Sequence, residues 1–174
     1  TQGVYPDTTV AFDVGRGLSL AAVERADGND KYVFVTRQTD AQKEFPEGED
    51  LCTVGTVCVI RQATRLPGER VRVFVAGQYR AAARGFRLEN GYIYAVTEEL
   101  LTVHGDPTLE EAYFRTAKEL VKDISGGETK AAKELDAALT GVSDPDSYIN
   151  ICAHQLRLRD EVKQELLEEP VLVR

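Results

Sequence analysis

Two turn sequences divide residues 51–97 into four short segments that predict antiparallel strands. The first is L-P-G-E at 66–69. The second is N-G at 90–91, which suits a type I′ hairpin because both central residues need a positive φ. Between the turns, Val71, Val73 and Val75 recur at every second position, the period of a strand with one buried face. We therefore expect two hairpins, built from strands at 51–65, 70–80, 83–88 and 92–97.

The residues before these hairpins predict two more strands and one early helix. Residues 8–14 alternate and end at G-R-G, after which 18–26 has helical periodicity. Residues 31–36 are mostly apolar, as in a strand that is buried on both faces, and 40–50 are polar and predict a loop. About six strands joined mostly by hairpins are typical of a small barrel or a strongly coiled sheet.

The sequence after His104 predicts helices instead. Thr108 and Glu111 have the spacing of a capping box, and four large apolar residues follow at helical spacing, namely Leu109, Tyr113, Leu120 and Ile124. S-G-G at 125–127 ends this helix, and a second helix runs to Leu139 before Gly141. Asp144 caps a third helix that begins at Pro145, and the last helix spans about 160–169.

The charge distribution supports a division into two parts. Residues 1–100 hold 12 basic and 14 acidic side chains, against 9 and 15 in residues 101–174, for a net charge of −8. We expect an α+β chain with a β-rich pseudo-barrel at 1–104 and a small helical subdomain at 105–174. The helical subdomain is expected to be truncated at its C-terminal end.

Composition excludes several classes of protein. Apolar residues make up 43% and charged residues 29% of the 174, which excludes a disordered or collagen-like chain. The acidic balance disfavours nucleic-acid binding, which needs clustered Lys and Arg. Neither a secretory signal nor an apolar run of the roughly 18 residues that span a bilayer is visible, so we expect a cytoplasmic protein without membrane contact.

No catalytic, cofactor or metal site emerges from the motifs. The sequence contains neither a GxxxxGK[ST] phosphate loop nor a G-x-S-x-G elbow, and the Gly-rich 15–19 segment lacks the third glycine of a dinucleotide fingerprint. His104 and His154 have no adjacent nucleophile. Cys52, Cys58 and Cys152 lack zinc-ligand spacing, so we expect reduced, small apolar residues.

The order of several segments resembles the amino-terminal domain of Lon proteases. V-Y-P-D at 4–7 and D-V-G-R at 13–16 resemble the V-F-P-G and D-V-G-R motifs that open that domain, and K-Q-E-L-L-E at 163–168 is similar to its K-Q-x-L-L-E helix. D-L-C-T-V-G-T-V at 50–57, L-P-G at 66–68 and V-R-V-F-V-A-G-Q-Y-R at 71–80 are similar to further family segments. Ala76 replaces a frequent Glu, and Gly17-Leu18 replaces a charged pair.

The resemblance implies a PUA-like body followed by helices, which recognises unfolded or degron-bearing proteins and contributes to hexamer assembly. It also implies that the parent is an ATP-dependent serine endopeptidase. The ATPase module, with its ATP and Mg²⁺, and the Ser–Lys protease module would lie outside these 174 residues, and no cofactor is expected within them.

Exposed apolar side chains near loops are the candidates for gripping an unfolded chain. They are Tyr5, Pro6, Arg16, Leu18, Leu66 and Pro67, where Arg16 accompanies Leu18 at the helix start. Apolar stripes in the predicted tail are candidates for homo-oligomer contacts, and they comprise Ile149, Cys152, Leu156, Leu166 and Leu167. Two other functions stay open: a stand-alone adaptor that presents protein substrates to separate machinery, and a PUA-like RNA-binding module.

Overall fold

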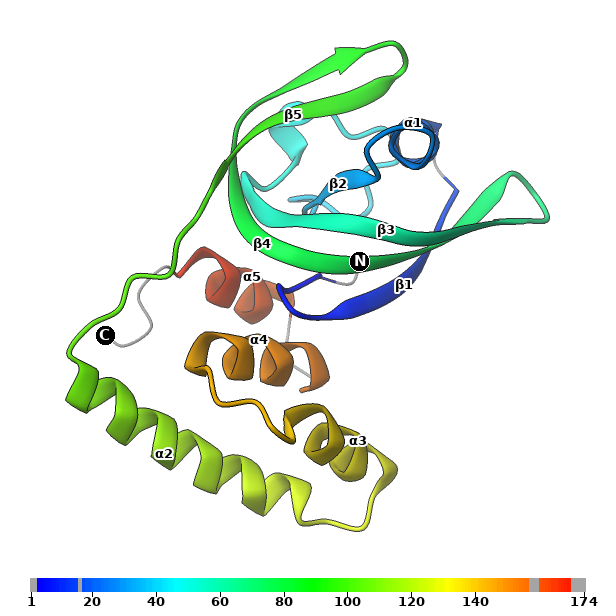
Figure 1. Cartoon of the computed structure of the whole chain (residues 1–174). Coiled ribbons are helices and arrows are strands. Elements are labelled where there is room, and N and C mark those ends of the chain that lie inside the picture. Colours follow the sequence, from blue (N-terminus) through cyan, green and yellow to red (C-terminus); the bar gives the residue numbers. More distant parts are fainter. Residues whose placement is uncertain (1–2, 16, 157–159, 170–174) are drawn as a thin grey trace. The chain divides into compact units, whose positions relative to one another are not determined.

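The computed structural model describes residues 3–15, 17–156 and 160–169 of the chain. It divides into two compact units, Thr1–Leu100 and Leu101–Arg174 (Figure 1). The first unit carries the sheet and one α-helix, and the second carries the remaining α-helices. The predicted α+β class, a β-rich body followed by a helical subdomain, is confirmed. The division into domains at 1–104 and 105–174 stays a prediction.

The first unit is built on an antiparallel sheet that contains five strands among the described residues. Its order is β1-β4-β3-β2, and β5 also pairs with β4. The first strand in the chain, β1, therefore lies at one end of this order and pairs with β4. The strands are β1 (Thr9–Val14), β2 (Tyr32–Val35), β3 (Val54–Leu66), β4 (Arg70–Glu89) and β5 (Tyr92–Glu99).

One long strand, β4, replaces the two strands expected at 70–80 and 83–88. It pairs with β3 from Arg70 to Ala82 and with β5 from Ala81 to Glu89. The prediction of two separate strands at 70–80 and 83–88 was wrong, because residues 81 and 82 are both alanine and contain no turn signal. The chain accommodates the change of partner with a register shift between Ala83 and Gly85, and β4 curves toward β5 (Figure 1).

Both predicted turns are present and have the backbone geometry that their sequences require. Asn90 and Gly91 have φ values of 51° and 81°, as a type I′ hairpin needs. In the other turn Gly68 has a φ of 79° and Glu69 a φ of 54°. The turns therefore fix the registers of β3 against β4 and of β4 against β5.

Helix α1 (Gly17–Asp27) agrees with the predicted early helix and closes the core of the first unit. It contacts β5, β2 and β3, so it lies on the concave side of the curved sheet (Figure 1). Val23 and Ala26 of α1 are buried in the same cluster as Ile60, Val73 and Val75 of the sheet. The alternation at 71–75 thus marks the face that points to the core.

The prediction that residues 31–36 are buried on both faces was wrong. Tyr32 is 53% exposed and the other residues of β2 are half-buried. In the described part of the chain β2 pairs only with β3, so it lies at an edge of the sheet. The predicted loop at 40–50 is present, with one 3₁₀ turn, η1 (Gly48–Asp50), at its end.

The second unit contains four helices among its described residues. They are α2 (Pro107–Ser125), α3 (Lys130–Leu139), α4 (Pro145–Gln155) and α5 (Asp160–Glu168). Helix α3 contacts both α2 and α4, and the rings of Phe114 and Tyr148 meet edge-on at 5.1 Å. Ala132 and Leu135 of α3 are buried.

The caps of these helices agree with the prediction at two positions and differ at one. Asp144 accepts a hydrogen bond from the Ser147 backbone N–H, and Gly141 follows α3 with a φ of 81°, both as predicted. The N-cap of α2, however, is Asp106 and not Thr108. The Asp106 carboxylate accepts hydrogen bonds from the N–H groups of Thr108 and Leu109, because Pro107 occupies the first helical position.

Candidate functional site

The segment that carries Tyr5 and Pro6 is fastened over the middle of β4. Thr56 Oγ1 donates to the Val4 carbonyl at 2.6 Å, and Thr8 Oγ1 donates to the Tyr5 carbonyl at 2.6 Å. Gly77 of β4 exchanges backbone hydrogen bonds with the same segment, donating to Thr8 O and accepting from Asp7 N. Both Tyr5, at 3% exposure, and Pro6 are buried. The expectation that these two side chains are exposed was therefore wrong.

The start of α1 and the β3–β4 turn lie at one end of the sheet of the first unit. Val14, the last residue of β1, pairs with Val71, and the Arg70 side chain lies against Gly15. From the other strand, Arg65 Nη2 contacts Glu24 Oε1 of α1 at 3.1 Å. Residues far apart in sequence thus reach the same end of the sheet.

We call the apolar residues at this end the turn-end surface, which consists of Leu18, Leu66 and Pro67. Pro67 is exposed, whereas Leu18 and Leu66 are half-buried. Arg16, which was predicted to accompany Leu18, lies outside the described residues. The structure therefore brings three of the six predicted contact residues to one end of the sheet and leaves Tyr5 and Pro6 at the opposite end of β1.

Paired charges border the turn-end surface. Arg72 Nε and Nη2 lie 2.7 and 3.1 Å from the two carboxylate oxygens of Asp13. These hydrogen bonds, with a smaller attraction from Arg70, hold the pKa of the Asp13 carboxyl below its usual value. Arg65 and Glu24 form a second pair. Both basic and acidic side chains of the described residues therefore lie beside the apolar end.

Several exposed apolar side chains were not among the sequence candidates. Phe74 is 36% exposed on the outer face of the sheet, between β1 and β3, and Tyr94 and Val96 are more than 40% exposed on β5. The signal for Phe74 was available, since the buried residues at 71, 73 and 75 place residue 74 on the opposite face. Tyr94 and Val96 lie two positions apart and share the exposed face of β5.

The residues predicted to mediate self-association lie on α4, just after it, and on α5. Ile149 is 36% and Leu166 40% exposed, whereas Cys152 and Leu156 are half-buried and Leu167 is buried at 6%. The Leu156 backbone N–H donates to the Cys152 carbonyl and ends α4. Exposure is thus restricted to two of the five residues, and their role in self-association stays a prediction.

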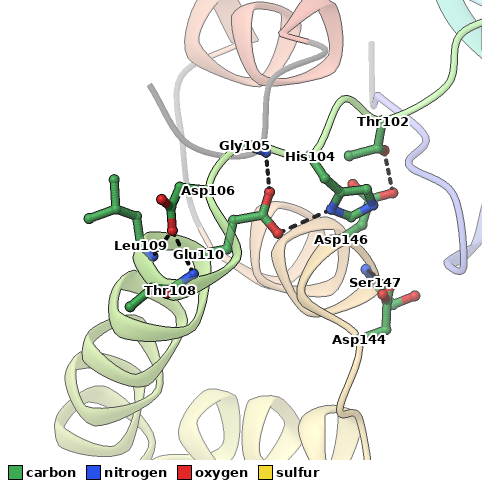
Figure 2. Close-up of polar contacts among 10 residues, drawn as sticks. All are labelled: Thr102, His104, Gly105, Asp106, Thr108, Leu109, Glu110, Asp144, Asp146 and Ser147. Carbon is green, nitrogen blue, oxygen red and sulfur yellow. Dashed lines mark hydrogen bonds and ion pairs between the residues drawn. The ribbon is translucent and has the colours of Figure 1, made fainter.

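A network of polar contacts joins the segment before α2 to the start of α4 within the second unit (Figure 2). Thr102 Oγ1 donates to Asp146 Oδ2 at 2.8 Å. Glu110 accepts from the Gly105 N–H at 2.5 Å and lies 3.1 Å from His104 Nδ1. Each of these contacts satisfies a helix end or fixes the entering chain, so the network has a structural role.

Two cysteines and one histidine of the described residues have pKa values that are shifted by burial. Burial raises the pKa of the Cys58 thiol to about 12 and also raises that of Cys152, which keeps both thiols protonated and unreactive. Burial, with repulsion from Lys163, lowers the pKa of His154.

No cluster of three or more His, Cys, Asp or Glu residues in the described ranges could hold a metal ion. Nor does any helix of those ranges have the length and hydropathy to cross a membrane.

Comparisons with known proteins identify the family. The model of the ATP-dependent protease La (LON) substrate-binding domain matches residues 2–174. A Lon protease of Clostridioides difficile is 32% identical over 171 residues, 95% of this chain and 22% of that protein. One from Lawsonia intracellularis is 35% identical over 172 residues, 97% of this chain and 21% of that protein. The chain thus spans about a fifth of the length of these relatives.

Solved structures agree with the fold. The N-terminal domain of Mycobacterium avium complex Lon protease has a TM-score of 0.74 at 16% identity, over 98% of this chain and 87% of that one. The Lon N-terminal domain protein from Xanthomonas campestris has a TM-score of 0.61 at 15% identity, over 99% and 88%. Because the family model covers nearly every residue, the chain belongs to the family of Lon substrate-binding domains.

Proposed function

We propose that this chain binds unfolded or degron-bearing polypeptides and delivers them to an ATP-dependent Lon protease of which it is part. The observation that carries the proposal is the match of the substrate-binding family model to residues 2–174. The chain's own residues would bind and position the polypeptide and perform no chemical step. The relatives are about five times longer and are named Lon proteases, which is consistent with chemistry located elsewhere in a longer protein.

The longer protein would be a serine endopeptidase that degrades misfolded proteins in the cytoplasm. ATP and Mg²⁺ would bind to an ATPase module outside these 174 residues, and the whole protein would assemble as a homo-oligomer, a hexamer by family resemblance. Peptide-bond cleavage would likewise take place outside this chain.

The turn-end surface is the part of the first unit that we propose for the polypeptide contact. An unfolded chain exposes apolar side chains that a folded protein buries, so a receptor needs apolar groups that are accessible at its own surface. Pro67 fits this requirement because it is exposed at the tip of a turn, and Leu18 and Leu66 lie at the same end of the sheet. Binding by three apolar side chains would be weak, since ordering a disordered partner costs several kcal/mol.

The test is the affinity of the chain for a fluorescent, permanently unfolded protein with blocked cysteines, measured by anisotropy. The same protein in its folded form is the competitor that should have no effect. We expect Pro67→Asp to weaken binding about fivefold, which corresponds to about 1 kcal/mol, because the loss of one apolar contact is of that size. The aspartate suits the turn and leaves Gly68 in place.

Phe45→Asp is the matched control, because Phe45 is 77% exposed in a loop of the same unit and lies outside the turn-end surface. The Phe45→Asp variant should bind the unfolded protein with the same affinity as the unmodified chain. Equal losses in the two variants would remove the turn-end surface from the proposal. Failure of the unmodified chain to prefer the unfolded protein would refute the proposed function itself.

A further inference from the structure

Strand β1 forms an edge of the sheet of the first unit, beside β4 (Figure 1). Gly77 of β4 donates to the Thr8 carbonyl, so Thr8 directs its backbone groups toward β4. Successive residues of a strand alternate in this direction, so Thr9, Ala11 and Asp13 direct their N–H and C=O groups away from β4. No other described segment of the chain donates to or accepts from these backbone groups.

The other two outer strands, β2 and β5, have protection along their edges. Helix α1 contacts both of them. On β2, the outward N–H of Tyr32 donates to the Asp30 carboxylate at 3.0 Å, so a side chain already occupies that position. A covering helix and a blocking side chain are usual protections against pairing with another chain, as are proline and lysine on the edge strand itself. Strand β1 contains neither proline nor lysine, and its charged side chain, Asp13, is paired with Arg72 of β4.

The chemistry of an open strand edge specifies what can cover it. Its donors and acceptors have the spacing of an extended backbone, so a polypeptide segment in the β conformation can pair with all of them. A folded protein has few backbone groups free for such pairing, because its own secondary structure uses them. An unfolded chain offers them whatever its sequence is. The edge of β1 therefore selects the unfolded state and not a particular sequence.

We propose that an extended segment of the bound polypeptide adds to the sheet as a further strand beside β1. This inference rests on the proposed function and specifies how the polypeptide is held. Strand β1 ends at Val14, at the end of the sheet that carries the turn-end surface, so one bound chain reaches both. On the face of Thr9 and Ala11, the side chains of the added strand meet short, exposed neighbours, which admit residues of different sizes.

The first experiment removes one outward N–H group of β1. Ala11→Pro deletes the donor of residue 11 and places the proline ring at the open edge, whereas the hydrogen bonds between β1 and β4 do not use this donor. The variant should fold, because edge strands tolerate proline where the N–H would face solvent. We expect it to bind the fluorescent, permanently unfolded protein about tenfold or more weakly than the unmodified chain does, as measured by anisotropy.

Ala11→Thr is the matched control for this variant. Threonine adds a branched side chain at the same position, suits a strand and keeps the N–H group. Ala11→Thr should therefore bind the unfolded protein with the affinity of the unmodified chain. Two-dimensional amide spectra show whether both variants keep the fold of the unmodified chain.

The second experiment needs no substitution and measures amide hydrogen exchange of the unmodified chain, residue by residue, by NMR. Without a partner, the outward amides of Thr9, Ala11 and Asp13 should exchange fast, and those of Val10 and Phe12, which face β4, should exchange slowly. A saturating concentration of the unfolded protein should slow exchange at the three outward amides about tenfold or more, because each becomes a donor to the added strand. The same protein in its folded form should leave their exchange unchanged.

Two results would overturn the added strand and leave the proposed function standing. One is unchanged exchange at the three outward amides while the unfolded protein is bound, and the other is equal affinity of Ala11→Pro and Ala11→Thr. If the unmodified chain does not prefer the unfolded protein to the folded one, the proposed function is refuted, and this inference with it. Should Ala11→Pro not fold, the exchange experiment decides alone.

Discussion

Gly77 shows how one residue fixes the first segment of the chain on the sheet. A Cβ atom at this position would overlap the Tyr5 carbonyl oxygen and lie 2.9 Å from its carbon. Both partners are backbone, so neither can rotate away. The absence of a side chain at Gly77 therefore allows the backbone hydrogen bonds with Asp7 and Thr8 to form.

We predict that Gly77→Ala lowers the free energy of unfolding by about 2 kcal/mol or more, because the backbone must move to admit the methyl group. Gly85→Ala, on the same strand, is the control. Its Cβ would meet nothing within 4 Å, and its effect should stay below about 0.5 kcal/mol. Urea unfolding of both variants measures the difference. Similar midpoints for the two would show that the segment before β1 is not held over β4 as described.

At the scale of elements, the end of α2 depends on one carboxylate. Asp106 accepts hydrogen bonds at 2.8 and 3.3 Å from the N–H groups of Thr108 and Leu109, which have no partner within the helix. Sequence spacing favoured Thr108 as the cap, with Glu111 three residues later. Proline at 107 was the decisive signal, because proline is favoured at the first helical position and thus places the cap at the residue before it.

Substitutions at Asp106 and Thr108 test which of the two residues is the N-cap of α2. Asp106→Ala should lower the free energy of unfolding by about 1 kcal/mol, the usual cost of losing an N-cap. Asp106→Ser should keep most of the stability that the cap provides, because serine also caps helices. Thr108→Ala should be nearly neutral, because the Thr108 contact described here uses its backbone N–H. Thermal unfolding followed by circular dichroism measures all three variants. A larger loss at Thr108 than at Asp106 would restore the capping box.

Most elements could be predicted from the sequence because their signals are local. Turn residues, proline, glycine and apolar periodicity located both hairpins, helix α1 and the four later helices. The continuity of β4 could not be predicted in this way. Whether a strand continues through alanines 81 and 82 depends on its partners, β3 on one part and β5 on the next, and these pairings form only in the folded chain.

Exposure was the weakest part of the sequence prediction. Tyr5 and Pro6 precede a strand and looked accessible, yet hydrogen bonds from Thr8 and Thr56 hold their segment against the sheet. The apolar spacing along α2 is that of a core-facing helix, yet Leu120 is 61% exposed and Phe114 makes the contact with α4. Periodicity shows which residues share a face, and only the packing of the other elements decides which face is covered.

At the scale of the whole molecule, the proposed polypeptide contact belongs to one of the two units. The β-rich unit, Thr1–Leu100, carries all three residues of the turn-end surface, and the helical unit carries none of them. Substitutions of exposed residues in the helical unit should therefore leave the affinity for the unfolded protein unchanged.

The most direct test of the central claim is a set of two-dimensional amide spectra of the isotope-labelled chain, recorded with an unlabelled unfolded protein and with the same protein folded. We predict shifts of the amide signals of residues 17–20, 66 and 68–70 with the unfolded protein, and none with the folded one. Identical spectra in the presence and absence of the unfolded protein would contradict substrate binding by this chain. Shifts that spare both segments would contradict the turn-end surface.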